Sequence, residues 1–123
     1  KFGNDGAGGA GGGGSIYISN ATAIPNTLTL QANGGNGGNQ VISFGAFASS
    51  PTMEADGPGG GGGGGYISIS SGTPIQQVNG GASGVTNSTF VPNFPPNGAT
   101  GGAAGLTNTN ASFYDIIAAN DTF

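Results

Sequence analysis

Very few side chains in this sequence could do acid–base or metal chemistry. The six charged residues of the 123-residue chain are Lys1, Asp5, Glu54, Asp56, Asp115 and Asp121. Glu54 and Asp56 stand two positions apart, and Asp5 lies in the sequence Gly-Asn-Asp-Gly. Carboxylates, together with backbone oxygens, are the ligands that a hard cation such as Ca²⁺ prefers. Asp5, Glu54 and Asp56 are therefore candidate calcium ligands, but solvated loop charges explain them as well, and we expect no metal site.

The rest of the composition excludes most enzyme classes. The chain has no His and no Cys, and Lys1 is its single basic residue. A Ser-His-Asp triad, a His- or Cys-ligated zinc ion and a thiol nucleophile are therefore ruled out. Residues 6–11 match the pattern G-x-G-x-x-G, but they precede an expected strand, whereas a dinucleotide site needs this pattern between a strand and a helix. We expect no catalytic residue, no cofactor and no enzyme activity.

The charge balance also excludes several partners. The formal net charge is −4 and the isoelectric point is about 4.1, so phosphate backbones and anionic lipid surfaces are repelled. No apolar run approaches the length of about 18 residues that a membrane-spanning helix needs. The sequence predicts no nucleic-acid partner and no membrane insertion. Because it begins at Lys1 instead of Met, we expect removal of a leader and an extracellular or cell-surface location.

Polar motifs indicate two possible kinds of surface. Four N-x-S/T sequons make Asn20, Asn87, Asn110 and Asn120 candidate glycosylation sites. Alternating threonines at residues 27–29 and 107–109 are typical of ice-binding faces. Solvent-facing threonines in ordinary strands explain the same pattern, so the threonines are compatible with an ice-binding face and with ordinary strands.

Glycine-rich runs alternate with short strand-like segments. The 29 glycines are concentrated in residues 3–14, 57–65 and 98–105. After the first two runs, isoleucine alternates with polar or aromatic residues, and this period of two predicts half-buried strands. The expected strands are residues 15–19, 27–30, 41–44, 66–70 and 75–78.

The first two runs and their strands form two copies of one unit. Each copy has a glycine run, a strand, a proline-containing turn, a second strand and an Asn-Gly-Gly turn. Ile16 and Ile67 are 51 positions apart, and Asn33 and Asn79 are 46 apart. The expected organisation is a single domain of residues 1–123, with repeat unit 1 at about 6–38, repeat unit 2 at about 57–84, and a C-terminal extended segment over 90–123.

These patterns predict an all-β fold. We expect short strands, antiparallel or solenoid-like, in a small sandwich or solenoid-like array with polyglycine-II-like segments and no long helix. The expected core is thin and consists of Ile16, Ile18, Leu28, Leu30, Val41, Phe44, Ile67, Ile69 and Val78.

The glycine runs bear on assembly. A polyglycine-II helix has three residues per turn and no internal hydrogen bonds, so its backbone groups need partners on neighbouring rods. Ordering 29 glycines costs on the order of 30–60 kcal/mol, and the chain has few large side chains to bury. We therefore expect copies of the chain to stabilise one another as a homo-oligomer or polymer. A donor strand for this assembly is expected in the C-terminal segment, within residues 113–119, and the candidate assembly residues are Phe113, Tyr114, Ile116 and Ile117. A strand that packs on its own subunit explains this apolar stretch as well.

Two families share these features. The sequences GGGGSIYIS and NGGNGG resemble the glycine-rich repeats of bacterial extracellular and surface β-solenoid proteins, and the run at residues 59–65 resembles polyglycine-II segments of bacteriophage tail-fibre-tip adhesins. The resemblance covers about residues 6–84 and implies no catalytic residue. It favours a structural subunit of an extracellular filament or surface polymer. The alternative is an adhesin or binding module whose residues 90–97 contact a cell surface or glycan; an ice-binding protein is more remote.

Overall fold

Five short strands and no helix make up the regular structure of the described chain. The computed structural model describes residues 6–41, 57–89 and 91–111. The strands are β1 (Ser15–Ile18), β2 (Thr29–Gln31), β3 (Tyr66–Ile69), β4 (Ile75–Gln77) and β5 (Leu106–Asn108). They form a three-stranded sheet of order β1-β3-β5 and a two-stranded sheet of β2 and β4. For the described residues, the expected mainly β structure without a long helix is confirmed.

The three strand pairs of the described residues are parallel, so the antiparallel alternative is wrong for these pairs. Parallel pairing follows from the repeated units, because corresponding strands of the two units lie side by side. Ile16 pairs with Ile67 in register, at the same separation of 51 positions that relates the units in the sequence. Thr29 likewise pairs with Ile75, 46 positions further along the chain.

Four strands were expected within a residue or two of their observed positions, and β5 was not expected. Leu106-Thr107-Asn108 lacks a clear alternation of apolar and polar residues, and it forms a strand beside the edge of β3. The expected strand at residues 41–44 begins at Val41, which is not in a strand. Its other three residues lie outside the described part of the chain.

Five extended segments, which we call rods, continue the strands at one end. They are rod 1 (residues 6–14), rod 2 (32–40), rod 3 (57–65), rod 4 (78–86) and rod 5 (99–105). Hydrogen bonds between rods recur at every third residue. Between rods 1 and 3, the N–H groups of Ala7, Ala10 and Gly13 donate to carbonyl oxygens of rod 3, each at 3.0 Å. This period of three is that of polyproline-II geometry.

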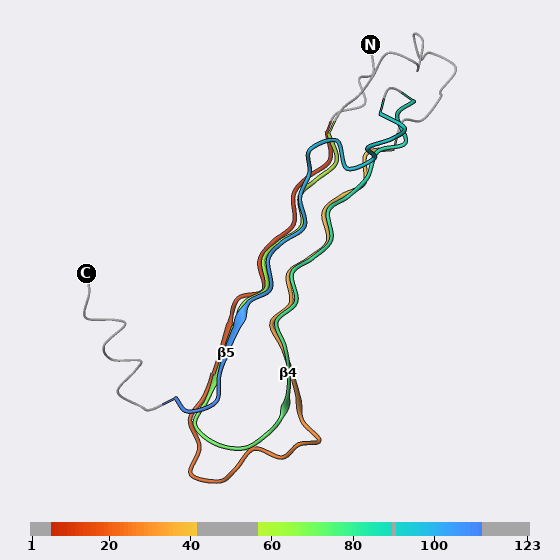
Figure 1. Cartoon of the computed structure of the whole chain (residues 1–123). Coiled ribbons are helices and arrows are strands. Elements are labelled where there is room, and N and C mark those ends of the chain that lie inside the picture. Colours follow the sequence, from red (N-terminus) through yellow and green to blue (C-terminus); the bar gives the residue numbers. More distant parts are fainter. Residues whose placement is uncertain (1–5, 42–56, 90, 112–123) are drawn as a thin grey trace, which may run out of the picture.

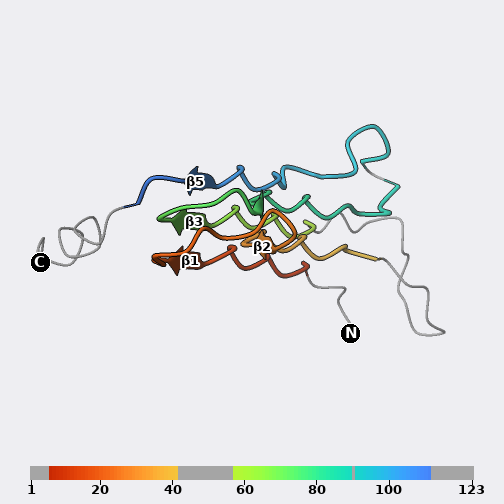
Figure 2. The ribbon, with the colours of Figure 1, turned by 90° about the horizontal axis from the view of Figure 1, so that it is seen from below.

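The rods form two layers (Figures 1 and 2). Rods 1, 3 and 5 run in one direction in the first layer, and rods 2 and 4 run in the opposite direction in the second. Rod 2 lies between rods 1 and 3, since the Gly35 N–H donates to Gly11 O at 3.0 Å and Gly35 O accepts from the Gly62 N–H at 2.9 Å. Rod 4 lies between rods 3 and 5, since the Gly81 N–H donates to Gly62 O and Gly81 O accepts from the Gly102 N–H. Rod 3 is therefore bonded to all four other rods, and these partners come from the same chain.

Two local predictions are wrong. The Asn-Gly-Gly pieces at residues 33–38 and 79–81, expected as turns, lie inside rods 2 and 4 because their backbone groups pair with neighbouring rods. Residues 91–97 are not extended. The Phe94 N–H donates to Val91 O at 3.1 Å and the Asn97 N–H to Phe94 O at 2.9 Å, which makes consecutive turns. The prolines of this segment fix φ near a value that turns accept.

The apolar core lies where the two layers separate, between the two sheets (Figure 1). Glycine rods have no side chains to hold the layers apart, whereas the strands carry aliphatic side chains between them. Ile67 and Ile69 are completely buried and pack with Leu30 and with Ile24 and Ala32, which were not expected in the core.

The other expected core residues differ in outcome. Ile16, Ile18 and Val78 are partly buried against the core. Leu28 and Val41 are 42% and 64% exposed, so their assignment to the core is wrong. Leu28 closes a turn with Pro25 O and precedes β2, and Val41 follows the end of rod 2. Phe44 lies outside the described residues.

Candidate functional site

The part of the chain that the structure describes has no charged side chain, because all six charged residues lie outside it. The candidate calcium ligands Asp5, Glu54 and Asp56 are therefore not placed. The candidate assembly residues Phe113, Tyr114, Ile116 and Ile117 and the sequon residue Asn120 also lie outside the described ranges. Within residues 6–41, 57–89 and 91–111, no group of three or more His, Cys, Asp or Glu side chains exists.

The other three sequon residues, Asn20, Asn87 and Asn110, are exposed. Asn20 is held at the end of β1 by Ser70, whose Oγ accepts from the Asn20 N–H at 2.9 Å and donates to Asn20 O at 3.0 Å. Their glycosylation stays a prediction. The threonine pairs of the ice-binding alternative do not form one array, since Thr29 is in β2 and Thr107 is in β5, and these strands belong to different sheets.

A ladder of asparagine side chains joins rods 2 and 4. Three side-chain Oδ1 atoms of rod 2 accept backbone N–H groups of rod 4. The bonds are from Asn79 to Asn33 at 2.8 Å, from Ala82 to Asn36 at 2.9 Å and from Val85 to Asn39 at 3.0 Å. The same rod 4 residues accept backbone N–H groups of rod 2 through their carbonyl oxygens. The asparagine side chains thus supply acceptors that an additional rod would otherwise provide.

Sequence reasoning missed this ladder, although its signal is present. Asn33, Asn36 and Asn39 recur every third residue, and that period matches neither a strand nor an α-helix. It matches a rod with three residues per turn, on which every third side chain lies on one side.

Replacing Asn36 with alanine should destabilise the bundle by about 0.5–1.5 kcal/mol, the net value of one hydrogen bond. The cost stays modest because Asn36 is exposed and water can reach the freed Ala82 N–H. Urea denaturation followed by circular dichroism measures the change. Asn26→Ala is the matched control, because Asn26 is exposed and its side chain has no hydrogen bond among the described residues. An equal loss for both variants would contradict a stabilising ladder.

The outer face of the three-rod layer is poor in side chains. Its positions are Gly6, Gly9 and Gly12 in rod 1, Gly57, Gly60 and Gly63 in rod 3, and Thr100 and Ala103 in rod 5. The face continues in register onto the strands through Ser15, Tyr66 and Leu106.

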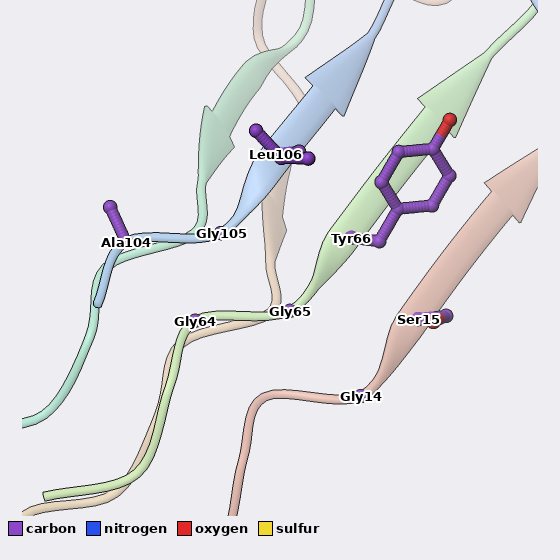
Figure 3. Close-up of a pocket in the computed structure, with 8 residues that line it drawn as sticks. All are labelled: Gly14, Ser15, Gly64, Gly65, Tyr66, Ala104, Gly105 and Leu106. Atoms are coloured by element: carbon purple, nitrogen blue, oxygen red, sulfur yellow. The ribbon is translucent and has the colours of Figure 1, made fainter. Parts of the chain in front are cut away.

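An open hollow of about 420 Å³ lies on this face where rods become strands (Figure 3). Glycine backbone lines it together with Ser15, Tyr66, Ala104 and Leu106. Tyr66 is 40% exposed and Leu106 is 72% exposed. These groups can stack against a ring or cover an apolar surface, and they include no carboxylate, imidazole or amine for acid–base chemistry.

Comparison with protein-family models, with curated proteins and with solved structures finds no match. In the described ranges there is also no helix of the length and hydrophobicity needed to cross a membrane.

Proposed function

We propose that the protein is a structural subunit of an extracellular filament or surface polymer, and that its rods are polyglycine-II helices. One observation carries this proposal: five rods of an uncharged segment pair by the same three-residue rule, mainly through backbone groups. Such pairing requires only a backbone with few or small side chains and N–H and carbonyl groups that recur at every third residue. A further copy of the chain can therefore continue it without a new kind of interface.

The position of each rod supports assembly. Rod 3 has hydrogen-bonded neighbours on four sides, whereas rods 1 and 5 bond to two rods each within the described chain. Yet rod 1 is built of Gly and Ala much as rod 3 is built almost entirely of Gly, and rod 5 consists of Ala, Gly and a single Thr. A self-assembling subunit accounts for outer rods whose side chains are as small as these. The extracellular location rests on the sequence alone.

Electron microscopy of the purified full chain tests this function. We expect regular filaments in negative stain, and sedimentation velocity should show their amount rising with protein concentration. Compact particles of a single chain at every concentration would contradict the proposal.

The second candidate function is an adhesin or binding module, and the hollow beside Tyr66 and Leu106 favours it. The turns at residues 91–97 add a second exposed aromatic group, since Phe94 is 58% exposed. For this function we expect Tyr66→Ala to weaken binding to cells or to an immobilised glycan at least about tenfold without a change in the circular dichroism spectrum. Unchanged binding by this variant would remove the hollow as the contact site.

A further inference from the structure

Hydrogen bonds from one rod to the next in the three-rod layer point one way. The described exceptions are at the first residues of β3 and β5, where the Tyr66 and Leu106 N–H groups donate back to Gly14 O and Gly65 O. The N–H groups of rod 1 donate to rod 3. In the same direction, the N–H groups of Gly61 and Gly64 donate from rod 3 to rod 5, to Thr100 O at 2.9 Å and to Ala103 O at 2.8 Å. A layer with one bonding direction ends in two different edges, one with donors and one with acceptors.

The outer edge of rod 5 is the donor edge. By the register that pairs Tyr66 with Leu106, Gly101 and Ala104 correspond to Gly61 and Gly64, so their N–H groups point away from rod 3. Among the described residues, these two N–H groups have no hydrogen-bond partner.

The outer edge of rod 1 is the acceptor edge. By the register that pairs Ser15 with Tyr66, the carbonyl groups of rod 1 that point away from rod 3 are those of Gly6, Gly9 and Gly12. No donor to them is found in the described part of the chain. The spacing of three residues is the same on both edges.

The sequence keeps the rod 1 edge free of side chains, although the isolated subunit has room for them. Gly59 and Gly62 of rod 3 must be glycine because an added Cβ would overlap the carbonyl groups of Gly8 and Gly11. Gly8 and Gly11 are the corresponding residues of rod 1, and a Cβ on either would meet no atom within 4 Å. Among the described residues of one copy, nothing therefore requires glycine at these two positions for steric reasons.

We propose that the rod 5 edge of one copy binds the rod 1 edge of the next, with the Gly101 N–H donating to Gly9 O and the Ala104 N–H to Gly12 O. This inference rests on the proposed function as a filament subunit, and it specifies the interface between neighbouring subunits. Ala104 fits beside a neighbour, because rod 1 carries alanines at equivalent positions, Ala7 and Ala10, next to rod 3. In the same contact, β5 of one copy lies parallel to β1 of the next.

This contact joins two different surfaces, so it is heterologous and repeats without closing when copies are related by translation. Copies then add side by side in one continuous layer, and the filament axis is perpendicular to the rods. The strand spacing of about 4.8 Å therefore runs along the filament axis. One subunit contributes three rods, so the subunit repeat is about 14 Å, three such spacings.

Two double variants of the full chain test the interface. Gly8→Ala with Gly11→Ala places methyl groups on the proposed edge. Gly9→Ala with Gly12→Ala places them on the outer face of the same rod, 3.8 Å from Gly60 O and 3.6 Å from Gly63 O. We expect neither variant to lower the melting temperature, because alanine at an open position is neutral or slightly stabilising. The edge variant should raise the concentration needed for filaments at least about tenfold, and the face variant should leave it unchanged.

The outcomes separate this inference from the proposed function. If the unmodified chain forms no filaments, the proposed function fails. If it forms filaments and the edge variant assembles equally well, or both variants lose assembly equally, the interface is overturned and the function stands. Fibre diffraction of the unmodified filaments is independent of any variant: a reflection near 4.8 Å along the filament axis supports the interface, and one perpendicular to the axis overturns it.

Discussion

Replacing Gly62 with alanine should destabilise the protein by about 3 kcal/mol or more. Gly62 is buried in the central rod, and its added Cβ would overlap the carbonyl group of Gly11 and lie 3.2 Å from the Gly12 nitrogen. Both are backbone atoms, and Gly11 O accepts the Gly35 N–H of rod 2, so they cannot move aside as a flexible side chain can. Small domains are stable by only about 5–15 kcal/mol, so this substitution alone can partly unfold the protein at room temperature. Urea denaturation followed by circular dichroism measures the loss.

The adjacent residue is the matched control. Gly63 is exposed on the outer face, and its Cβ would lie 3.9 Å from Ala103 O, an ordinary contact. Gly63→Ala should be neutral or stabilise the protein by about 0.4–1 kcal/mol, because alanine restricts the unfolded chain more than glycine does. Similar losses for the two neighbouring substitutions would contradict the packing of rod 3 between rods 1, 2, 4 and 5.

The strands could be predicted from the sequence because their signal is local. Ile16 and Ile18, like Ile67 and Ile69, alternate with other residues and are β-branched, and both properties favour a strand with one face buried. The separation of 51 residues between the two units also became the register of β1 and β3. A duplicated segment thus pairs with its own copy in parallel.

The rods could not be predicted from local sequence in the same way, because the sequence Asn-Gly-Gly is equally compatible with a turn and with a rod. What keeps residues 33–38 extended is pairing with rods 1, 3 and 4, which are far away in the sequence. Composition correctly indicated that the glycine backbone needs neighbours, but it could not tell whether these belong to the same chain. The structure places the hydrogen-bond partners of rod 3 within the chain.

The candidate site could be predicted least. The chemistry-bearing residues that the sequence singled out lie outside the described ranges, whereas the asparagine ladder and the two complementary edges arise from backbone geometry. The two edges depend on which rod lies outermost, and no property of Gly8 or Gly11 by itself distinguishes them from Gly59 or Gly62. Only the order β1-β3-β5 does so.

Replacing Ile67 with alanine should cost about 2–5 kcal/mol. Ile67 is 0% exposed in the middle strand and packs in a cluster with Ile24, Leu30 and Ile69. The substitution removes apolar contacts and leaves a cavity between the two sheets, which the rods cannot close because the hydrogen bonds of the rods fix the distance between the layers. Thermal and urea denaturation of the variant measure the loss.

Ile75→Ala is the matched control, since Ile75 is also in a strand but is 51% exposed. It should cost no more than about 1 kcal/mol, the span of β propensity. The comparison separates two sources of stability in this fold, the aliphatic core and the backbone hydrogen bonds of the rods. A large difference between the variants means that the aliphatic core makes the rods pair, because backbone hydrogen bonds alone contribute little net free energy. Equal and small losses would contradict that view, and the rods themselves would then have to supply most of the stability.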